Sequence, residues 1–154
     1  MQHTLDDIDR KLLRALQRDC KQTSNEIAEQ VGLSQTPCLR RIRNLETAGV
    51  IEKYVAILNP DVLGLGMTFF VRVWLTGQDE ATVERFTKDV QRLQNVVECH
   101  LMAGDCDFLL RVLAKDIAAY RRFQIEHLNS LAGVQSVKTE IPMQRIKCSS
   151  EIPI

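Results

Sequence analysis

Apolar residues recur every three or four positions along the first fifty residues, a spacing typical of amphipathic helices. A first helix is expected over residues 4–19, with acidic residues near its N-terminus, where the helix dipole favours them. Thr23 and Glu26 have the spacing of a capping box, so a second helix is expected to begin there and to end at Gly32. The expected buried stripe of the first helix comprises Ile8, Leu12, Ala15 and Leu16.

A third helix is expected from about Ser34 to Thr47. Ser34 is its expected N-cap, Pro37 is tolerated in the first turn, and Gly49 is placed as a C-cap. Two helices joined by a short turn that contains glycine form the helix-turn-helix layout, in which the second helix lies in the major groove of DNA. The expected buried stripe of this helix is Leu39, Ile42 and Leu45.

The third helix carries the residues expected to contact DNA. Its arginines fall outside the expected stripe, and its N-terminal tip is polar, as suits the end that usually reaches base edges. Cys38 is interpreted as a helix-packing or backbone-proximal residue. Two alternatives stay open, because such arginines are often only the solvated face of an ordinary helix and helical hairpins are common. The candidate DNA-binding residues are Ser34, Gln35, Thr36, Cys38, Arg40, Arg41 and Arg43.

Helical spacing gives way to alternation after Ile51. Residues 51–60 are expected to form a strand that Pro60 ends, and the rest of the chain follows the order βαββαβ. This order predicts an α+β fold of the ferredoxin-like type, whose two helices cover one face of an antiparallel sheet. The other face needs a cover, which predicts a homodimer. The expected strands are 67–75, 96–103, 108–114 and 134–147, and the expected helices are 80–93 and 117–131.

Composition narrows the function classes. The 154-residue chain has 20 Lys and Arg against 20 Asp and Glu, so DNA binding has to rely on a small basic patch repeated by oligomerisation. No apolar run approaches the roughly 20 residues that span a bilayer, and we expect a cytoplasmic protein. The five cysteines and three histidines form no ligand pattern, so no metal site is expected. They are Cys20, Cys38, Cys99, Cys106, Cys148, His3, His100 and His127.

Three segments in register resemble the Lrp/AsnC family of feast/famine regulators: LDDIDRKLLRALQRD, GLSQTPCLRRIRNLETAGVI and LMAGDCDFLLRVL. The resemblance runs essentially end to end. It implies a helix-turn-helix (winged-helix-like) domain over residues 1–50, a linker strand over 51–61 and a ferredoxin-like effector-binding and oligomerisation domain over 62–154. It also implies dimers that associate further, often to octamers, and transcriptional control by a small amino acid.

The same resemblance places the amino-acid effector at the turn between the second and third strands of the effector domain. A carboxylate there can bind the ammonium of an amino acid, and backbone N–H groups can bind its carboxylate. The family often has an aromatic residue where Cys106 stands. Cys106 leaves a modest, uncharged pocket wall, which favours a small or apolar effector such as leucine, methionine or cysteine. Cys106 is expected to be an exposed, unreactive thiol. The implied effector-binding residues are Gly104, Asp105, Cys106, Asp107, Gly133, Val134 and Thr139.

Three alternatives stay open. The turn is also compatible with a plain acidic β-turn, because glycine and aspartate are favoured there for backbone reasons. Sirohaem decarboxylases resemble the same family, and a tetrapyrrole site would draw on residues such as His100 and His127. An assembly module with a vestigial DNA-binding domain is the third. The intact arginine-bearing helix favours a regulator, with no catalytic residues and no cofactor other than the effector.

Overall fold

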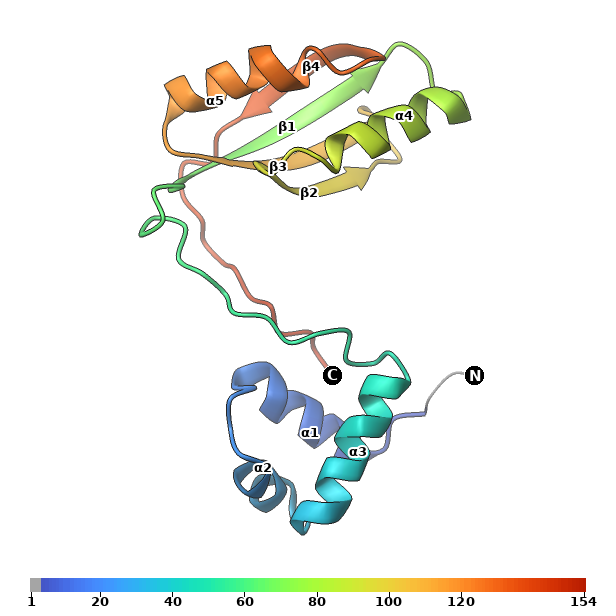
Figure 1. Ribbon diagram of the computed structural model, residues 1–154, viewed down its shortest axis with the longest axis vertical. Coiled ribbons are helices and arrows are strands. Elements are labelled where there is room, and N and C mark those ends of the chain that lie inside the picture. Colours follow the sequence, from blue (N-terminus) through green and yellow to red (C-terminus); the bar gives the residue numbers. More distant parts are fainter. Residues whose placement is uncertain (1–3) are drawn as a thin grey trace. The chain divides into compact units, whose positions relative to one another are not determined.

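The computed structural model describes residues 4–154, which form two compact units (Figure 1). One unit contains the chain up to Ile57 together with residues 146–154, and the other contains residues 58–145. The first three residues of the predicted DNA-binding domain, His3 among them, lie outside the described part of the chain. Each unit has its own hydrophobic core.

The first unit is built from three helices: α1 (Asp7–Arg18), α2 (Ser24–Val31) and α3 (Gln35–Thr47). The capping box predicted at α2 is confirmed, because the Thr23 hydroxyl accepts from the Glu26 N–H and the Glu26 carboxylate accepts from the Thr23 N–H. Gly32 ends α2 with a φ of 74°, a left-handed conformation that suits glycine. The helices meet over a core of Leu12, Ile27, Ala28, Val31 and Cys38.

The buried stripe of α3 differs from the predicted one. Cys38 and Leu45 are fully buried, whereas Leu39 and Ile42 are only partly buried. Positions 38, 42 and 45 follow the helical repeat, so the helix is turned toward Cys38 relative to the expected stripe. Ser34 stands at the N-cap, but its side chain forms no capping hydrogen bond.

The second unit is a four-stranded antiparallel sheet with helices on one face (Figure 1). The spatial order β2-β3-β1-β4 is that of a ferredoxin-like fold, as predicted. The last strand ends at Glu140 rather than at residue 147, and the helix begun by α5 continues as one π-helical turn. The elements are β1 (Met67–Leu75), α4 (Glu80–Val90), β2 (Val96–Leu101), β3 (Phe108–Ala114), α5 (Ile117–Phe123), η1 (Gln124–Leu128) and β4 (Val134–Glu140).

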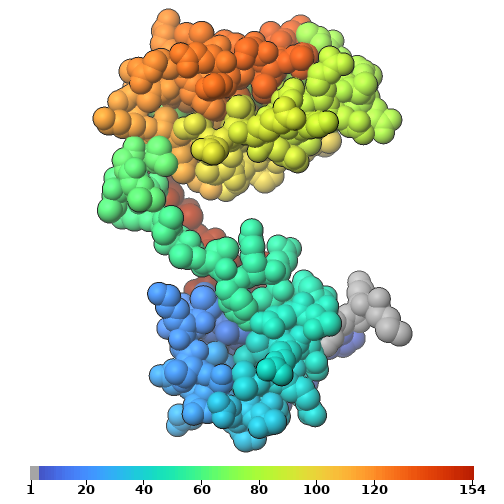
Figure 2. Space-filling view, viewed as in Figure 1, coloured from blue at the N-terminus to red at the C-terminus, as the bar shows by residue number. Residues whose placement is uncertain are grey.

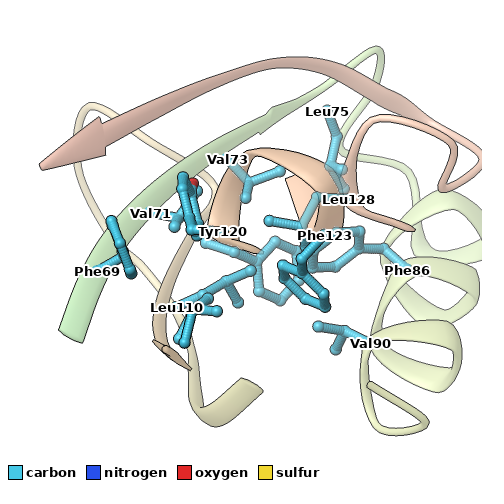
Figure 3. Close-up of a cluster of buried hydrophobic side chains, with 13 residues drawn as sticks. Phe69, Val71, Val73, Leu75, Phe86, Val90, Leu110, Tyr120, Phe123 and Leu128 are labelled. Atoms are coloured by element: carbon cyan, nitrogen blue, oxygen red, sulfur yellow. The ribbon is translucent and has the colours of Figure 1, made fainter. Parts of the chain in front are cut away.

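Alternation along β1 decides which side chains enter the core. Phe69, Val71 and Val73 are fully buried against the helices, with Phe69 stacked on Tyr120 of α5 at a centroid distance of 4.0 Å (Figure 3). Residues between them in the strand therefore point to the opposite, uncovered face of the sheet. That face carries Phe70, Arg72 and Trp74.

The strand expected over residues 51–61 is not formed. Residues 51–58 are irregular, and Asn59–Leu65 makes a turn closed by the Leu65 N–H donating to the Pro60 carbonyl over 2.8 Å. A strand needs a second strand to accept its hydrogen bonds, and the described chain supplies none here. The segment is nevertheless apolar and exposed (green in Figure 2); its exposed large side chains are Tyr54, Val55, Ile57, Leu58, Val62, Leu63 and Leu65.

The segment 146–154 belongs with the helical unit, not with the effector domain predicted to end at residue 154. Gln17 of α1 binds Ile152 twice: its side-chain oxygen accepts from the Ile152 N–H over 2.5 Å, and its amide donates to the Ile152 carbonyl over 3.1 Å. Arg14 Nε donates to the Ile154 backbone oxygen over 2.7 Å. These hydrogen bonds fix the segment to one flank of α1.

Candidate functional site

The exposed face of α3 is a candidate nucleic-acid interface. Ser34, Gln35 and Thr36 are exposed at its N-terminal tip, and Arg40 and Arg43 are exposed further along. Within residues 4–154 neither arginine forms a side-chain hydrogen bond or ion pair. Their guanidinium groups are therefore available to an external anion such as a DNA phosphate.

Arg41 is placed differently. Its Nη1 lies 2.7 Å from Asp6 Oδ2 and 2.8 Å from Asp9 Oδ1, so it joins α3 to the N-terminus of α1. These hydrogen bonds raise the pKa of the guanidinium. Because position 41 lies three residues after Cys38 and four before Leu45, the observed orientation of α3 turns it toward α1. The charge of Arg41 is thus engaged within the fold.

Cys38 is fully buried in the core of the helical unit, and burial raises the pKa of its thiol. Its prediction as part of the DNA-binding surface is wrong for the side chain, whereas the helix-packing interpretation agrees with the structure. Sequence reasoning did not name Asn44 and Thr47, which are exposed on the same helix. Asn44 and Thr47 lie four and seven residues after Arg40, and this spacing in the sequence indicates that they share the helix face of Arg40.

The turn Gly104–Asp107 is a second candidate site, and Asp107 anchors it. Its Oδ2 accepts from the Leu75 N–H over 2.7 Å, and its Oδ1 accepts from the Gln78 side chain over 2.8 Å. Its own N–H donates to the Val73 carbonyl over 3.0 Å. Trp74 Nε1 donates to the Asp105 carbonyl over 2.6 Å. Asp107 thereby ties the turn to the end of β1, while the Asp105 side chain forms no hydrogen bond in the described chain.

A cavity of about 300 Å³ lies between this turn and the uncovered face of the sheet. Three predicted residues line it: Gly104, Asp105 and Cys106. Cys106 is buried, at 8% exposure, so the expectation of an exposed thiol is wrong. The lining residues that sequence reasoning missed are Phe70, Arg72, Met102, Leu109 and Glu140.

The remaining predicted effector residues do not line this cavity. Gly133 and Val134 lie at the same end of the sheet, where Val134 pairs with Leu75 and the Gly133 carbonyl accepts from the Thr76 N–H over 2.8 Å. Thr139 pairs with Val71 and its hydroxyl lies 2.5 Å from that of Tyr120, on the helix-covered face. Thr139 therefore faces away from the turn's cavity.

Comparison with known proteins gives two matches that together span nearly the whole chain. The profile of the Lrp/AsnC ligand binding domain matches residues 68–152, and that of a winged helix-turn-helix DNA-binding domain matches residues 5–52. The chain belongs to the Lrp/AsnC family. Its helix-turn-helix is thus the DNA-binding domain of a transcription regulator, and its ferredoxin-like unit is the ligand-binding domain.

Individual relatives agree with this assignment. The leucine-responsive regulatory protein of Escherichia coli is 41% identical over 150 residues, which cover 97% of this chain and 92% of that protein. The structure of a Neisseria meningitidis transcriptional regulator in complex with L-methionine is similar, with a TM-score of 0.93, 35% identity and 97% of both chains covered. An AsnC family regulator from Agrobacterium tumefaciens has a TM-score of 0.92 and 38% identity, again with 97% of both chains covered.

Membership in the Lrp/AsnC family decides against the enzyme alternative. Its members are transcriptional regulators, not enzymes, so the decarboxylase alternative is set aside. Among residues 4–154 no group of three potential ligands from His, Cys, Asp or Glu is placed to hold a metal ion. No helix in this part of the chain is long and apolar enough to cross a membrane.

Proposed function

We propose that this Lrp/AsnC regulator senses an α-amino acid with an apolar side chain, bound in the cavity under the Gly104–Asp107 turn. The cavity carries the proposal because it joins an exposed carboxylate, Asp105, to apolar walls, including Phe70 and Leu109. Leucine, methionine and cysteine are the candidate effectors. The L-methionine bound to the similar Neisseria regulator supports this chemical class.

The proposed DNA contacts are those of the exposed face of α3. Gln35 and Thr36 are proposed to reach base edges from the helix tip, with Ser34 beside them, while Arg40 and Arg43 bind bases or phosphates. Arg41 contributes by orienting α3 on α1, because its Nη1 already donates to two carboxylates. The regulator is proposed to act in the cytoplasm.

Self-association is proposed because, within residues 58–145, helices cover only one face of the sheet. A second copy packed on the face that carries Trp74 would form a homodimer and would border the cavity that Phe70 and Arg72 line. The exposed apolar segment 54–65 is a further surface for such contacts. Dimers are proposed to associate to octamers with the effector site at the junction between dimers. A ligand bound there alters assembly only if it binds one arrangement better than the other.

The test of the proposed function is a melting-temperature panel with each of the twenty amino acids. A ligand that binds only the folded protein at 100 times its dissociation constant adds about 2.7 kcal/mol to the free energy of unfolding. Light scattering with and without the ligand would report the assembly against the 17.6 kDa mass of one chain. If no amino acid raises the melting temperature or binds by calorimetry, the proposed sensing is wrong.

A further inference from the structure

The polar lining of the cavity suggests how an amino acid would be held; this inference rests on the proposed function. Arg72 of β1 supplies one positive side chain, while Asp105 and Glu140 supply two negative ones. A zwitterionic amino acid requires one group of each sign. The rest of the lining is apolar, including Met102 and Cys106, and suits a side chain without charge.

Arg72 and Arg111 lie on the same face of the sheet but differ in how strongly their N–H groups are paired with carboxylates. Arg111 of β3 binds Glu98 Oε1 through Nε over 2.8 Å and through Nη2 over 2.7 Å, the lengths of strong charge-assisted hydrogen bonds. This contact holds the pKa of the Glu98 carboxyl below its usual range. Arg111 is not among the residues that line the cavity.

Arg72 is only loosely paired. Its Nη2 lies 3.4 Å from Glu140 Oε1 and 3.5 Å from Oε2, longer than a strong charge-assisted hydrogen bond. A guanidinium group has five N–H donors, and within residues 4–154 only Nη2 of the Arg72 side chain forms a hydrogen bond or ion pair. Its side chain is 38% exposed and lines the cavity. Glu140 is also near Lys138, at 3.8 Å.

We infer that Arg72 binds the α-carboxylate of the effector while Asp105 receives its ammonium group. A planar guanidinium matches a carboxylate through two parallel hydrogen bonds, and Arg72 has donors to offer. Trp74 holds the Asp105 backbone, which keeps that carboxylate beside the cavity. Arg72 therefore selects ligands that carry a free carboxylate, and the apolar lining selects among their side chains.

The experiment compares Arg72→Met with Arg111→Met, a matched loss of an arginine from the same sheet face outside the cavity. The probes are L-leucine and L-methionine, with isoamylamine as the leucine analogue that lacks the carboxylate. Calorimetry gives affinities, and the fluorescence of Trp74, the only tryptophan in the sequence, gives a second readout. Melting temperatures verify that each variant folds, and Arg72→Lys is included as the conservative variant.

We expect Arg72→Met to bind the effective amino acid at least tenfold more weakly, Arg72→Lys to lie between, and Arg111→Met to bind as the unaltered protein does. Isoamylamine should bind equally weakly to the unaltered protein and to Arg72→Met. If Arg72→Met retains full affinity while the unaltered protein binds an amino acid, the role of Arg72 is overturned and the sensing function stands. If the unaltered protein binds none of the twenty amino acids, both proposals are overturned.

Discussion

Arg41 on α3 donates a hydrogen bond of 2.8 Å to Asp9 on α1, whose side chain is only 7% exposed. The same nitrogen lies 2.7 Å from Asp6, which accepts the Asp9 N–H in the capping box at the start of α1. One arginine thus links the orientation of the recognition helix to the cap of the first helix. Arg41 is thus expected to act on the fold rather than on DNA directly.

Arg41→Ala is therefore expected to lower the free energy of unfolding of the helical unit by about 1–3 kcal/mol, because the buried Asp9 carboxylate loses a charged partner. Thermal or urea unfolding followed by circular dichroism measures the change. Arg40→Ala is the matched control, since Arg40 is exposed and forms no ion pair in the described chain. Equal stability of the two variants would contradict this account of Arg41.

Arg43→Ala is expected to weaken binding to duplex DNA without lowering the melting temperature, because its side chain is exposed on the outer face of α3. If the contact is to phosphate, the slope of log affinity against log salt concentration decreases by about one. Binding isotherms at several salt concentrations measure both quantities. Unchanged affinity in Arg40→Ala and Arg43→Ala alike would remove the exposed arginines from the interface.

Acid is expected to destabilise the helical unit through Asp6 and Glu26. The pKa of Asp6 lies below its ordinary 3.8, first because of the Asp9 N–H and then because of Arg41, and Thr23 lowers the pKa of Glu26 below 4.5. A carboxylate whose pKa is lower in the folded than in the unfolded protein stabilises the fold fully at pH values above its pKa in the unfolded protein. This contribution is lost as the pH falls through its pKa in the folded protein. The melting temperature should thus decrease as the pH is lowered below about 4.

In the variants Asp6→Asn and Glu26→Gln, the melting temperature should decrease less steeply with falling pH. It is measured from roughly pH 2.5 upward, the range over which carboxylates with lowered pKa values titrate. Asp7→Asn is the control, because the Asp7 side chain accepts no hydrogen bond in the described part of the chain. If the melting temperature decreases equally with falling pH in the unaltered protein and all three variants, these caps do not set the pH dependence of stability.

Asp107→Asn is expected to reduce the free energy of unfolding by about 1–3 kcal/mol, because its carboxylate accepts from the Leu75 backbone and the Gln78 side chain. Asp105→Asn should leave stability unchanged and weaken effector binding, since only the Asp105 backbone is hydrogen-bonded. Unfolding and calorimetry on both variants separate the two roles. Normal effector binding by both would show that the turn is not the sensor.

Gln17→Ala is expected to detach Ile152 from α1 while Arg14 still binds Ile154, because both hydrogen bonds between Ile152 and α1 are to the Gln17 side chain. Hydrogen–deuterium exchange of the Ile152 amide should become faster, while the core helices keep their protection. Arg10→Ala alters the same helix without touching this segment and serves as the control. Unchanged exchange at Ile152 in Gln17→Ala would contradict the contact.

The local pattern was sufficient to predict the elements of both units. Capping at Thr23 and Glu26, the left-handed end at Gly32 and the alternation along β1 are properties of neighbouring residues, so they can be predicted from order alone. The ferredoxin-like topology also followed, because the order of strands and helices leaves few ways to cover a sheet. The pattern failed at residues 51–61, since a strand depends on a partner that local sequence does not provide.

Tertiary packing decided how individual side chains are used. The three arginines of α3 look alike in sequence, and only the rotation of the helix toward Cys38 assigns Arg41 to Asp6 and Asp9 and leaves the other two exposed. Asp105 and Asp107 are likewise alike in the turn, yet packing against β1 makes Asp107 an anchor. Arg72 lines the same cavity as Gly104, which lies 32 residues later in the sequence, because β1 pairs with β3. Such proximity depends on the register of the strands rather than on sequence neighbours.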